Sequence, residues 1–208
     1  LFKWLHKAGV LDEDPAAALI QRSVGTPLPD ILTEEEIERT LRAARDIWGA
    51  EKPDARPHLL INLLLDTAMK KSECMGIRLE HIHREGEDAP YVQIRYDNPA
   101  RKVKERKLAL SPETVEVLDE YLEVYEPEDV LFPCTARNLE YVLDAVAELA
   151  EPEWEKKKGI SFQMLRWTAA VRDYQSGMDE RRIRQKLGIS EVTWQDTRKK
   201  LDALASDE

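Results

Sequence analysis

The sequence predicts a mainly α-helical protein that carries one small antiparallel β hairpin. A capping motif at residues 33–36 opens a clear amphipathic helix. The run at residues 57–69, PHLLINLLLDTAM, is apolar on nearly every face, which is typical of a helix at the centre of a core. Two short segments rich in β-forming residues lie on either side of one turn and give the hairpin.

The sequence before residue 33 predicts the end of one helix followed by a linker. Residues 1–10, LFKWLHKAGV, have the pattern of the last turns of an amphipathic helix, which stops near Gly9. Residues 25–29 contain two prolines and one glycine, which do not continue a helix and therefore predict a linker. Thr33 then begins the first strong helix, because its hydroxyl can accept the amide of Glu36 while the Glu36 carboxylate reaches back.

The hairpin is expected from two strands, residues 91–96 (YVQIRY) and 103–110 (VKERKLAL). The turn between them contains Pro99, which ends a strand because proline lacks the backbone donor. The sheet is therefore expected to be small and to lie between helices.

Local signals also place the remaining helices. Ser111 followed by Pro112 is a typical helix start, and residues 137–149 form another amphipathic helix. From residue 161 onward we expect three helical pieces that are separated at Gly177 and Gly188.

The charge of the chain is uneven. The formal net charge is −10, yet residues 151–208 hold 12 Lys and Arg against 11 Asp and Glu, so the acidity belongs to the first 150 residues. An acidic average disfavours a polyanionic partner, and any contact with DNA must therefore come from local basic clusters.

Several functional classes are not expected. No long apolar run or secretory leader occurs, which predicts a soluble protein of the cytoplasm. Cys74 and Cys134 stand alone in apolar surroundings, so we expect reduced thiols, no metal site and no cofactor.

Four sequence blocks in a characteristic order resemble one family. They are PDILTEEEIERTLRAA (29–44), LLLDTAMKKSECMGIRLEHI (63–82), VKERKLAL (103–110) and QMLRWT (163–168). Together they resemble the catalytic domain of tyrosine recombinases, also called phage integrases. The opening segment LFKWLHKAGVLDEDPAAAL resembles the last helix of the core-binding domain that precedes it. The resemblance implies two parts: the end of a core-binding domain with its linker at residues 1–24, and an integrase-like catalytic domain at 25–208.

In that family a tyrosine hydroxyl attacks a DNA phosphodiester and forms a 3′-phosphotyrosyl bond. Charge develops on the non-bridging oxygens, so two arginines hold them through fork-like hydrogen bonds. A lysine on the hairpin protonates the leaving oxygen, and histidines support proton transfer.

Four of the family's catalytic positions are substituted here. The first arginine falls on Lys70, and the H-x-L-R-H-T block keeps Arg166 but replaces its first histidine with Gln163. The L-G-H-S block places Ile189 where the family has histidine, and the tyrosine nucleophile falls on Arg198. The resemblance therefore implies a phosphate-clamp arginine without the nucleophile. Tyr174 is a poor substitute, because its place in the motif belongs to a core-packing residue.

The candidate DNA contacts lie in the hairpin and in the C-terminal quarter. Any of Arg101, Lys102 and Lys104 could take the place of the family lysine. The full set of expected DNA-binding residues is Arg101, Lys102, Lys104, Arg106, Arg181, Arg182, Arg184 and Lys199.

The sequence thus predicts a recombinase-like protein that binds double-stranded DNA without cleaving it. Its further partner would be an active recombinase or a second copy of itself. Two alternatives stay open. Residues 179–201 also have the pattern of a helix-turn-helix, which would make the chain a transcriptional regulator. The acidic composition would also suit a protein-interaction module derived from a recombinase.

Overall fold

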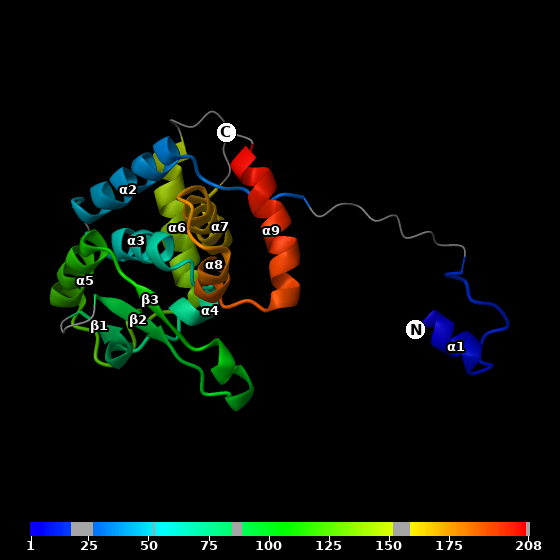
Figure 1. Cartoon of the computed structure of the whole chain (residues 1–208). Helices are drawn as coiled ribbons and strands as arrows, with labels where there is room; N and C mark the ends of the chain where they lie inside the picture. The colour runs from blue at the N-terminus through cyan, green and yellow to red at the C-terminus, as the bar shows by residue number, and fades with distance from the viewer. Residues whose placement is uncertain (18–26, 52, 85–88, 152–158, 207–208) are drawn as a thin grey trace.

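The computed structural model describes residues 1–17, 27–51, 53–84, 89–151 and 159–206. Its architecture is mainly helical with one small sheet, as the sequence predicts (Figure 1). The helices before the sheet are α1 (Phe2–Lys7), α2 (Glu34–Trp48), α3 (Arg56–Thr67) and α4 (Lys71–Cys74). The helices after it are α5 (Pro112–Tyr125), α6 (Ala136–Ala150), α7 (Phe162–Gln175), α8 (Glu180–Leu187) and α9 (Glu191–Ser206).

Helix α3 lies at the centre of the main core. Ten of its twelve residues are buried, and it packs against α2, α5, α6 and α7. Burial on every face explains why its sequence shows no polar stripe. The helix ends at Ala68, which has a left-handed backbone (φ 48°, ψ 27°), and the chain then turns directly into the segment that carries Lys70.

Predicted capping motifs define the helix starts. The Thr33 hydroxyl accepts the amide of Glu36, and the Glu36 carboxylate accepts the amide of Thr33 at 2.9 Å. Ser111 accepts the amide of Thr114 with Pro112 at the first helical position. Because these signals are local, the sequence placed both helices correctly.

The sheet differs from the prediction in three ways. It has three antiparallel strands in the order β1 (Ile82–His83), β2 (Tyr91–Ile94) and β3 (Arg106–Ala109). The prediction missed β1, which is only two residues long. The first predicted strand, 91–96, was two residues too long, because the structure ends this strand at Ile94. The second predicted strand, 103–110, was too long, because Pro99–Lys104 form a 3₁₀ helix, η2, that the Asn98 side chain caps. A further short 3₁₀ helix, η1 (Leu79–His81), precedes β1.

The last three helices form a smaller core of their own. Gly177 and Gly188 both adopt positive φ angles, 78° and 59°, where the sequence predicts the breaks. Apolar residues of α7, α8 and α9 pack together there, with Ile183, Trp194 and Leu201 among the buried ones. This packing places the α8–α9 turn beside the end of α3.

Helix α1 has no buried residue and lies apart from the other helices in Figure 1. Cys74 is buried and Cys134 is partly buried, and both are free thiols as expected. Among the described residues, no helix is long and apolar enough to span a membrane. The charged segment around Lys156 lies outside the described residues.

Candidate phosphate-binding site

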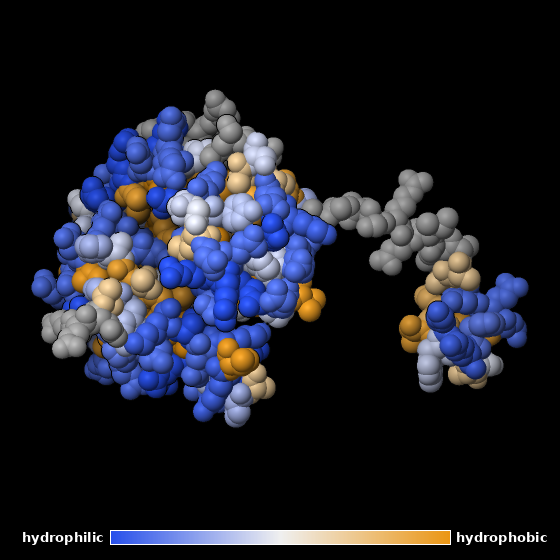
Figure 2. Space-filling model, viewed as in Figure 1, coloured by the Kyte–Doolittle hydropathy of each residue, from blue (hydrophilic) through white to orange (hydrophobic). Residues whose placement is uncertain are grey.

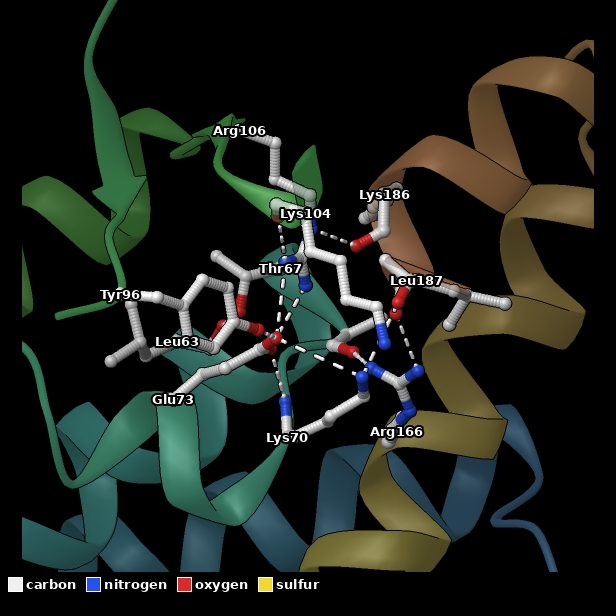
Figure 3. A network of polar contacts seen from close by, with 12 residues as sticks. Leu63, Thr67, Lys70, Glu73, Tyr96, Lys104, Arg106, Arg166, Lys186 and Leu187 are labelled. Atoms are coloured by element: carbon white, nitrogen blue, oxygen red, sulfur yellow. Dashed lines mark hydrogen bonds and ion pairs between the residues drawn. The ribbon is translucent and has the colours of Figure 1, made fainter. Parts of the chain in front are cut away.

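A buried carboxylate, Glu73, is the centre of the site (Figure 3). Its side chain is 0% exposed, and it receives both arms of the Arg106 guanidinium, Nη1 at 3.0 Å and Nη2 at 2.8 Å. The Tyr96 hydroxyl and the backbone amide of Lys70 also donate to it. The site therefore joins the start of α4 to strand β3 and to the residues after β2.

The pKa of Glu73 reflects two opposing effects. Burial alone would raise this pKa, but the hydrogen bonds and positive charge of Arg106 lower it more strongly, to about 2. The carboxylate is therefore ionised at any physiological pH, and the Glu73–Arg106 pair is a fixed part of the structure.

Three cationic side chains bind the C-terminal end of α8. Helix C-termini expose carbonyl groups without partners inside the helix and carry partial negative charge. Arg106 Nε donates to the carbonyl of Lys186 at 2.8 Å, and Arg166 Nη2 donates to that of Leu187 at 2.7 Å. Lys70 Nζ completes the set with a bond of 3.3 Å to the carbonyl of Gly188. Three elements far apart in the sequence are thereby fixed around one helix end.

Arg166 keeps unused hydrogen-bond donors after these contacts. It extends from α7, and its second bond goes from Nη1 to the carbonyl of Ala68. Two of its five N–H groups thus donate to the protein backbone, and the other three have no acceptor among the described residues. Burial lowers the pKa of Arg166 to about 10, so the guanidinium stays protonated at neutral pH.

The Lys70 side chain lies close to Arg166, because the two donate to adjacent carbonyls, those of Gly188 and Leu187. Burial lowers the pKa of Lys70, and two neighbouring guanidinium groups lower it further against the opposing carboxylate of Glu73. An anion placed here would relieve this repulsion between cations. Lys70 offers a single ammonium group, however, and not the bidentate fork of an arginine.

Lys70, Gln163 and Arg166 line one open cleft of about 760 Å³. The structure thus brings together three of the five positions that the family resemblance singled out. The cleft can hold an oxyanion through Arg166 and Lys70, while the Gln163 amide can donate a hydrogen bond but cannot transfer a proton near neutral pH. Trp167, which packs against the smaller core, also lines this cleft.

Ile189 lies in a second cleft, between the hairpin and α8. This cleft of about 720 Å³ is rich in cations. Its Lys and Arg residues are Lys104, Arg106, Lys107, Arg182, Arg184 and Lys186. Both clefts adjoin the C-terminal end of α8, since Lys70 lines one and Arg106 the other, and they donate to the carbonyls of Gly188 and Lys186.

Arg198 is held away from both clefts. It forms ion pairs with Glu180 at 3.2 Å and with Asp202 at 4.0 Å, and its side chain is 49% exposed. The Tyr174 hydroxyl donates to the same Asp202, which raises the pKa of that tyrosine. Among the described residues, neither Arg198 nor Tyr174 lines the clefts that contain Lys70 and Ile189.

The residues expected to contact DNA differ in their exposure and in their ion pairs. The exposed ones are Arg101, Lys102 and Lys104 on η2, Arg181 and Arg182 on α8, and Lys199 on α9. Arg184 is partly buried and pairs with Glu191.

The sequence predicts that Arg106 is an exposed DNA contact on the hairpin, but the structure buries most of its side chain. Its side chain is 10% exposed, and four of its five N–H groups already donate to protein acceptors. It is a structural residue in this conformation, because almost no donor is left for a phosphate.

Sequence reasoning missed the roles of Glu73 and Tyr96. Glu73 lies in the KKSE segment, three residues after Lys70. That spacing is typical of a capping box at a helix start, and it was the only signal in the sequence for the contact of Glu73 with the Lys70 amide. Its partner Arg106 is 33 residues away in the sequence, so no local pattern links them.

Comparison with known proteins connects this geometry to a family. The family model described as "Phage integrase family" matches residues 30–194. The chain is 27% identical over 201 residues to tyrosine recombinase XerC of Corynebacterium efficiens. This match covers 91% of this chain and 60% of that protein. The chain is also 24% identical over 208 residues to tyrosine recombinase XerD of Vibrio cholerae, covering 93% and 64%. The chain therefore spans less than two thirds of the length of these relatives.

Solved structures share the fold. XerH site-specific recombinase bound to a palindromic difH substrate matches with a TM-score of 0.70 and 24% identity, over 90% of this chain and 53% of that chain. A lambda integrase dimer bound to a COC′ core site matches with a TM-score of 0.67 and 16% identity, over 94% and 55%. At these identities the likeness concerns the fold of the polypeptide.

Proposed function

The chain belongs to the phage integrase family, and we propose that it binds double-stranded DNA through the phosphate backbone without cleaving it. The observation that carries this proposal is that cations still line the cleft, while the nucleophile position of the family is substituted. Two cations, Lys70 and Arg166, line the cleft, whereas Arg198 stands at the nucleophile position and is paired with carboxylates.

Binding is supported by the distribution of exposed cations. The tip of the hairpin, η2, presents Arg101, Lys102 and Lys104, and α8 presents Arg181 and Arg182. Acidic residues concentrate elsewhere: residues 112–129, which include α5, hold eight Asp and Glu and no Lys or Arg. A local positive field can attract DNA although the net charge of the chain is −10. Family members such as XerH have been solved on DNA.

The absence of cleavage is supported by the chemistry of the substituted positions. A guanidinium at residue 198 cannot form a phosphotyrosyl bond, and Gln163 cannot act as a general base. Removing the nucleophile from a covalent mechanism leaves binding and residual electrostatic stabilisation. The match to the family model also ends at residue 194, before this position.

We assign residues 25–208 to the integrase-like domain and residues 1–24 to the end of a core-binding domain with its linker. The exposed apolar side chains of α1, Phe2 and Trp4 among them, fit a helix whose partners belong to that other domain. We further propose that the protein acts in the cytoplasm, with an active recombinase or a second copy of itself as its partner on DNA.

A helix-turn-helix regulator is the second candidate. Helices α8 and α9 are joined by a short turn and carry exposed cations, as that function requires. On α9, however, Arg198 and Lys200 are paired with acidic neighbours, which weakens the expected reading helix. Both helices also share a core with α7, so they are an integral part of the integrase-like domain.

A fluorescence anisotropy titration of the 208-residue chain with labelled duplex DNA tests binding. Phosphate contacts release counterions, so the affinity should fall steeply and log-linearly as salt rises from about 50 to 200 mM. Binding that does not depend on salt, or no binding at 50 mM salt, would support the protein-interaction module instead.

A further inference from the structure

The tip of the hairpin carries an exposed apolar edge. Val103 is 88% exposed, and it lies on η2 (Pro99–Lys104), which joins β2 to β3 and projects from the body of the molecule (Figure 1). Side chains three residues apart lie on the same side of a 3₁₀ helix. Ala100 and Val103 therefore share one edge of η2, and both are exposed to solvent.

Cations lie on both sides of this apolar edge. The same three-residue period places Lys102 in the row of side chains on one side, and Arg101 with Lys104 in the row on the other side. All three side chains are exposed, and none of them forms an ion pair within the described part of the chain. Their positive charge is therefore available to attract an anionic partner.

The backbone of the tip is held at both ends. Asn98 Oδ1 accepts the amide of Ala100 at 3.0 Å where η2 begins, and Arg106 Nη1 donates to the carbonyl of Lys104 at 3.1 Å where it ends. Arg106 is itself held by the buried Glu73 carboxylate. A valine side chain has few rotamers, so little conformational entropy is lost when this tip inserts into a partner.

We propose that Val103 is an apolar wedge that enters between the base pairs of bound DNA while the cations beside it contact the phosphates. Apolar side chains of DNA-bending proteins act in this way, because they unstack one base step and kink the duplex. The cations around the edge favour DNA over an apolar protein surface as the partner. The inference rests on the proposed DNA binding, and it adds the property of the DNA that the protein selects.

Such a wedge selects DNA by its deformability. An aliphatic side chain has no donor or acceptor for the base edges, so it cannot read sequence through hydrogen bonds. Unstacking a base step costs free energy, and one valine side chain buries little apolar area in return. Insertion is therefore expected where stacking is weak, as at TA and CA/TG steps, and is unfavourable in stiff A-tracts. Val103 also lines the cation-rich cleft beside α8, so the kink would lie next to further phosphate contacts.

Two readouts on the same duplexes test the wedge separately from DNA binding. Fluorescence anisotropy measures affinity, and the fluorescence of 2-aminopurine, which rises when the base loses its stacking neighbour, measures unstacking. One duplex carries 2-aminopurine within alternating TA steps, and the other carries it within an A-tract of the same composition. We expect binding to the TA duplex to be tighter by about threefold or more, with a fluorescence rise on that duplex alone. Binding without a rise would overturn the wedge only, whereas no anisotropy change on either duplex would overturn DNA binding as well.

Matched valine variants assign the effect to the tip. Val103→Ser should abolish the fluorescence rise and bring the affinities for the two duplexes within about twofold of each other. The control is Val192→Ser, because Val192 on α9 is similarly exposed, at 84%, and lies outside the hairpin. This control should bind and unstack DNA as the wild type does. An unchanged fluorescence rise in Val103→Ser, or an equal loss in both variants, would contradict the proposal.

Discussion

At the scale of single residues, Glu73 determines how the candidate phosphate-binding site is held. Its carboxylate fixes Arg106, and Arg106 in turn holds the carbonyl of Lys186 at the end of α8. The same carboxylate accepts the amide of Lys70. One buried acid therefore positions a cation of the cleft and the helix end that lies opposite it.

Replacing this acid should destabilise the protein strongly. Glu73→Gln leaves the Arg106 guanidinium buried without its counter-charge, and breaking a buried pair in this way typically lowers the free energy of unfolding by about 3 kcal/mol or more. Chemical denaturation measures the change. The matched control is Glu140→Gln, which removes the exposed ion pair with Lys71 and should lower it by less than about 1 kcal/mol. Similar losses for the two variants would mean that the Glu73 pair is no stronger than a surface contact.

The depressed pKa of Glu73 predicts a stability change in acid. The pKa of Glu73 is about 2 in the folded protein, whereas the ordinary pKa of a glutamate side chain is 4.5. A lowered folded pKa stabilises the native state above the unfolded value, so this contribution is present above pH 4.5 and is lost as pH falls towards 2. It amounts to roughly 3 kcal/mol. Denaturation midpoints measured between pH 6 and pH 2.5 should fall less in Glu73→Gln than in the wild type, and parallel profiles would contradict this assignment.

Gly188 is required by two separate features. Its φ of +59° is a left-handed conformation, and a Cβ atom there would lie 2.7 Å from the Arg106 Cζ atom. Gly188→Ala should therefore lower the free energy of unfolding by more than the ~1–2 kcal/mol of the left-handed backbone alone.

Gly177→Ala is the control for this effect, because Gly177 is also left-handed (φ +78°) but has no atom within 4 Å of the added Cβ. Thermal denaturation should show a clearly larger loss for Gly188→Ala. An equal loss would mean that Arg106 moves aside at no cost.

At the scale of elements, the sequence was most informative where local chemistry decides the structure. The caps at Thr33 and Ser111 and the breaks at Gly177 and Gly188 were confirmed, because each depends on neighbours along the chain. The strand expected at 103–110 was too long at both ends. Val103 and Lys104 belong to the 3₁₀ helix that follows Asn98, and β3 runs only from Arg106 to Ala109.

The site itself was only partly accessible from the sequence. The clustering of Lys70, Gln163 and Arg166 could be expected from the family resemblance, and the structure places them along one cleft. The attachment of these cations to the α8 carbonyls was not predictable, since such bonds depend on how α7, β3 and α4 meet in space.

The hairpin tip should carry a measurable share of DNA binding. Val103 at this tip is 88% exposed between the cations, and Figure 2 shows an apolar spot there at the bottom of the molecule. Lys102→Ala with Lys104→Ala should weaken DNA binding and reduce the slope of log affinity against log salt by about 2, because two phosphate contacts are lost. Anisotropy measures both.

Two further pairs make this experiment specific. Arg42→Ala with Arg45→Ala removes two exposed cations from α2, on the far side of the molecule (Figure 1), and should leave the slope unchanged. Arg181→Ala with Arg182→Ala tests α8. Loss of binding only in the α8 pair would favour the helix-turn-helix regulator over a recombinase-like surface.

At the scale of the whole molecule, acidic and basic residues lie in different parts of the fold. The acidic residues of 112–129 accompany α5, and the exposed cations of η2 and α8 flank the phosphate site. The net charge of −10 therefore describes the whole chain but not the face that we expect DNA to approach.

The integrase-family chain is proposed to bind DNA without forming a covalent bond to it. The most direct measurement incubates the protein with a labelled pool of nicked duplexes of randomised sequence, which trap any phosphotyrosyl intermediate. One half of each mixture is run on a native gel and the other half on a denaturing gel. We predict a shifted complex on the native gel and no protein-linked DNA on the denaturing gel. A covalent protein–DNA band that survives denaturation would overturn this proposal and would point to Tyr174 or another nucleophile.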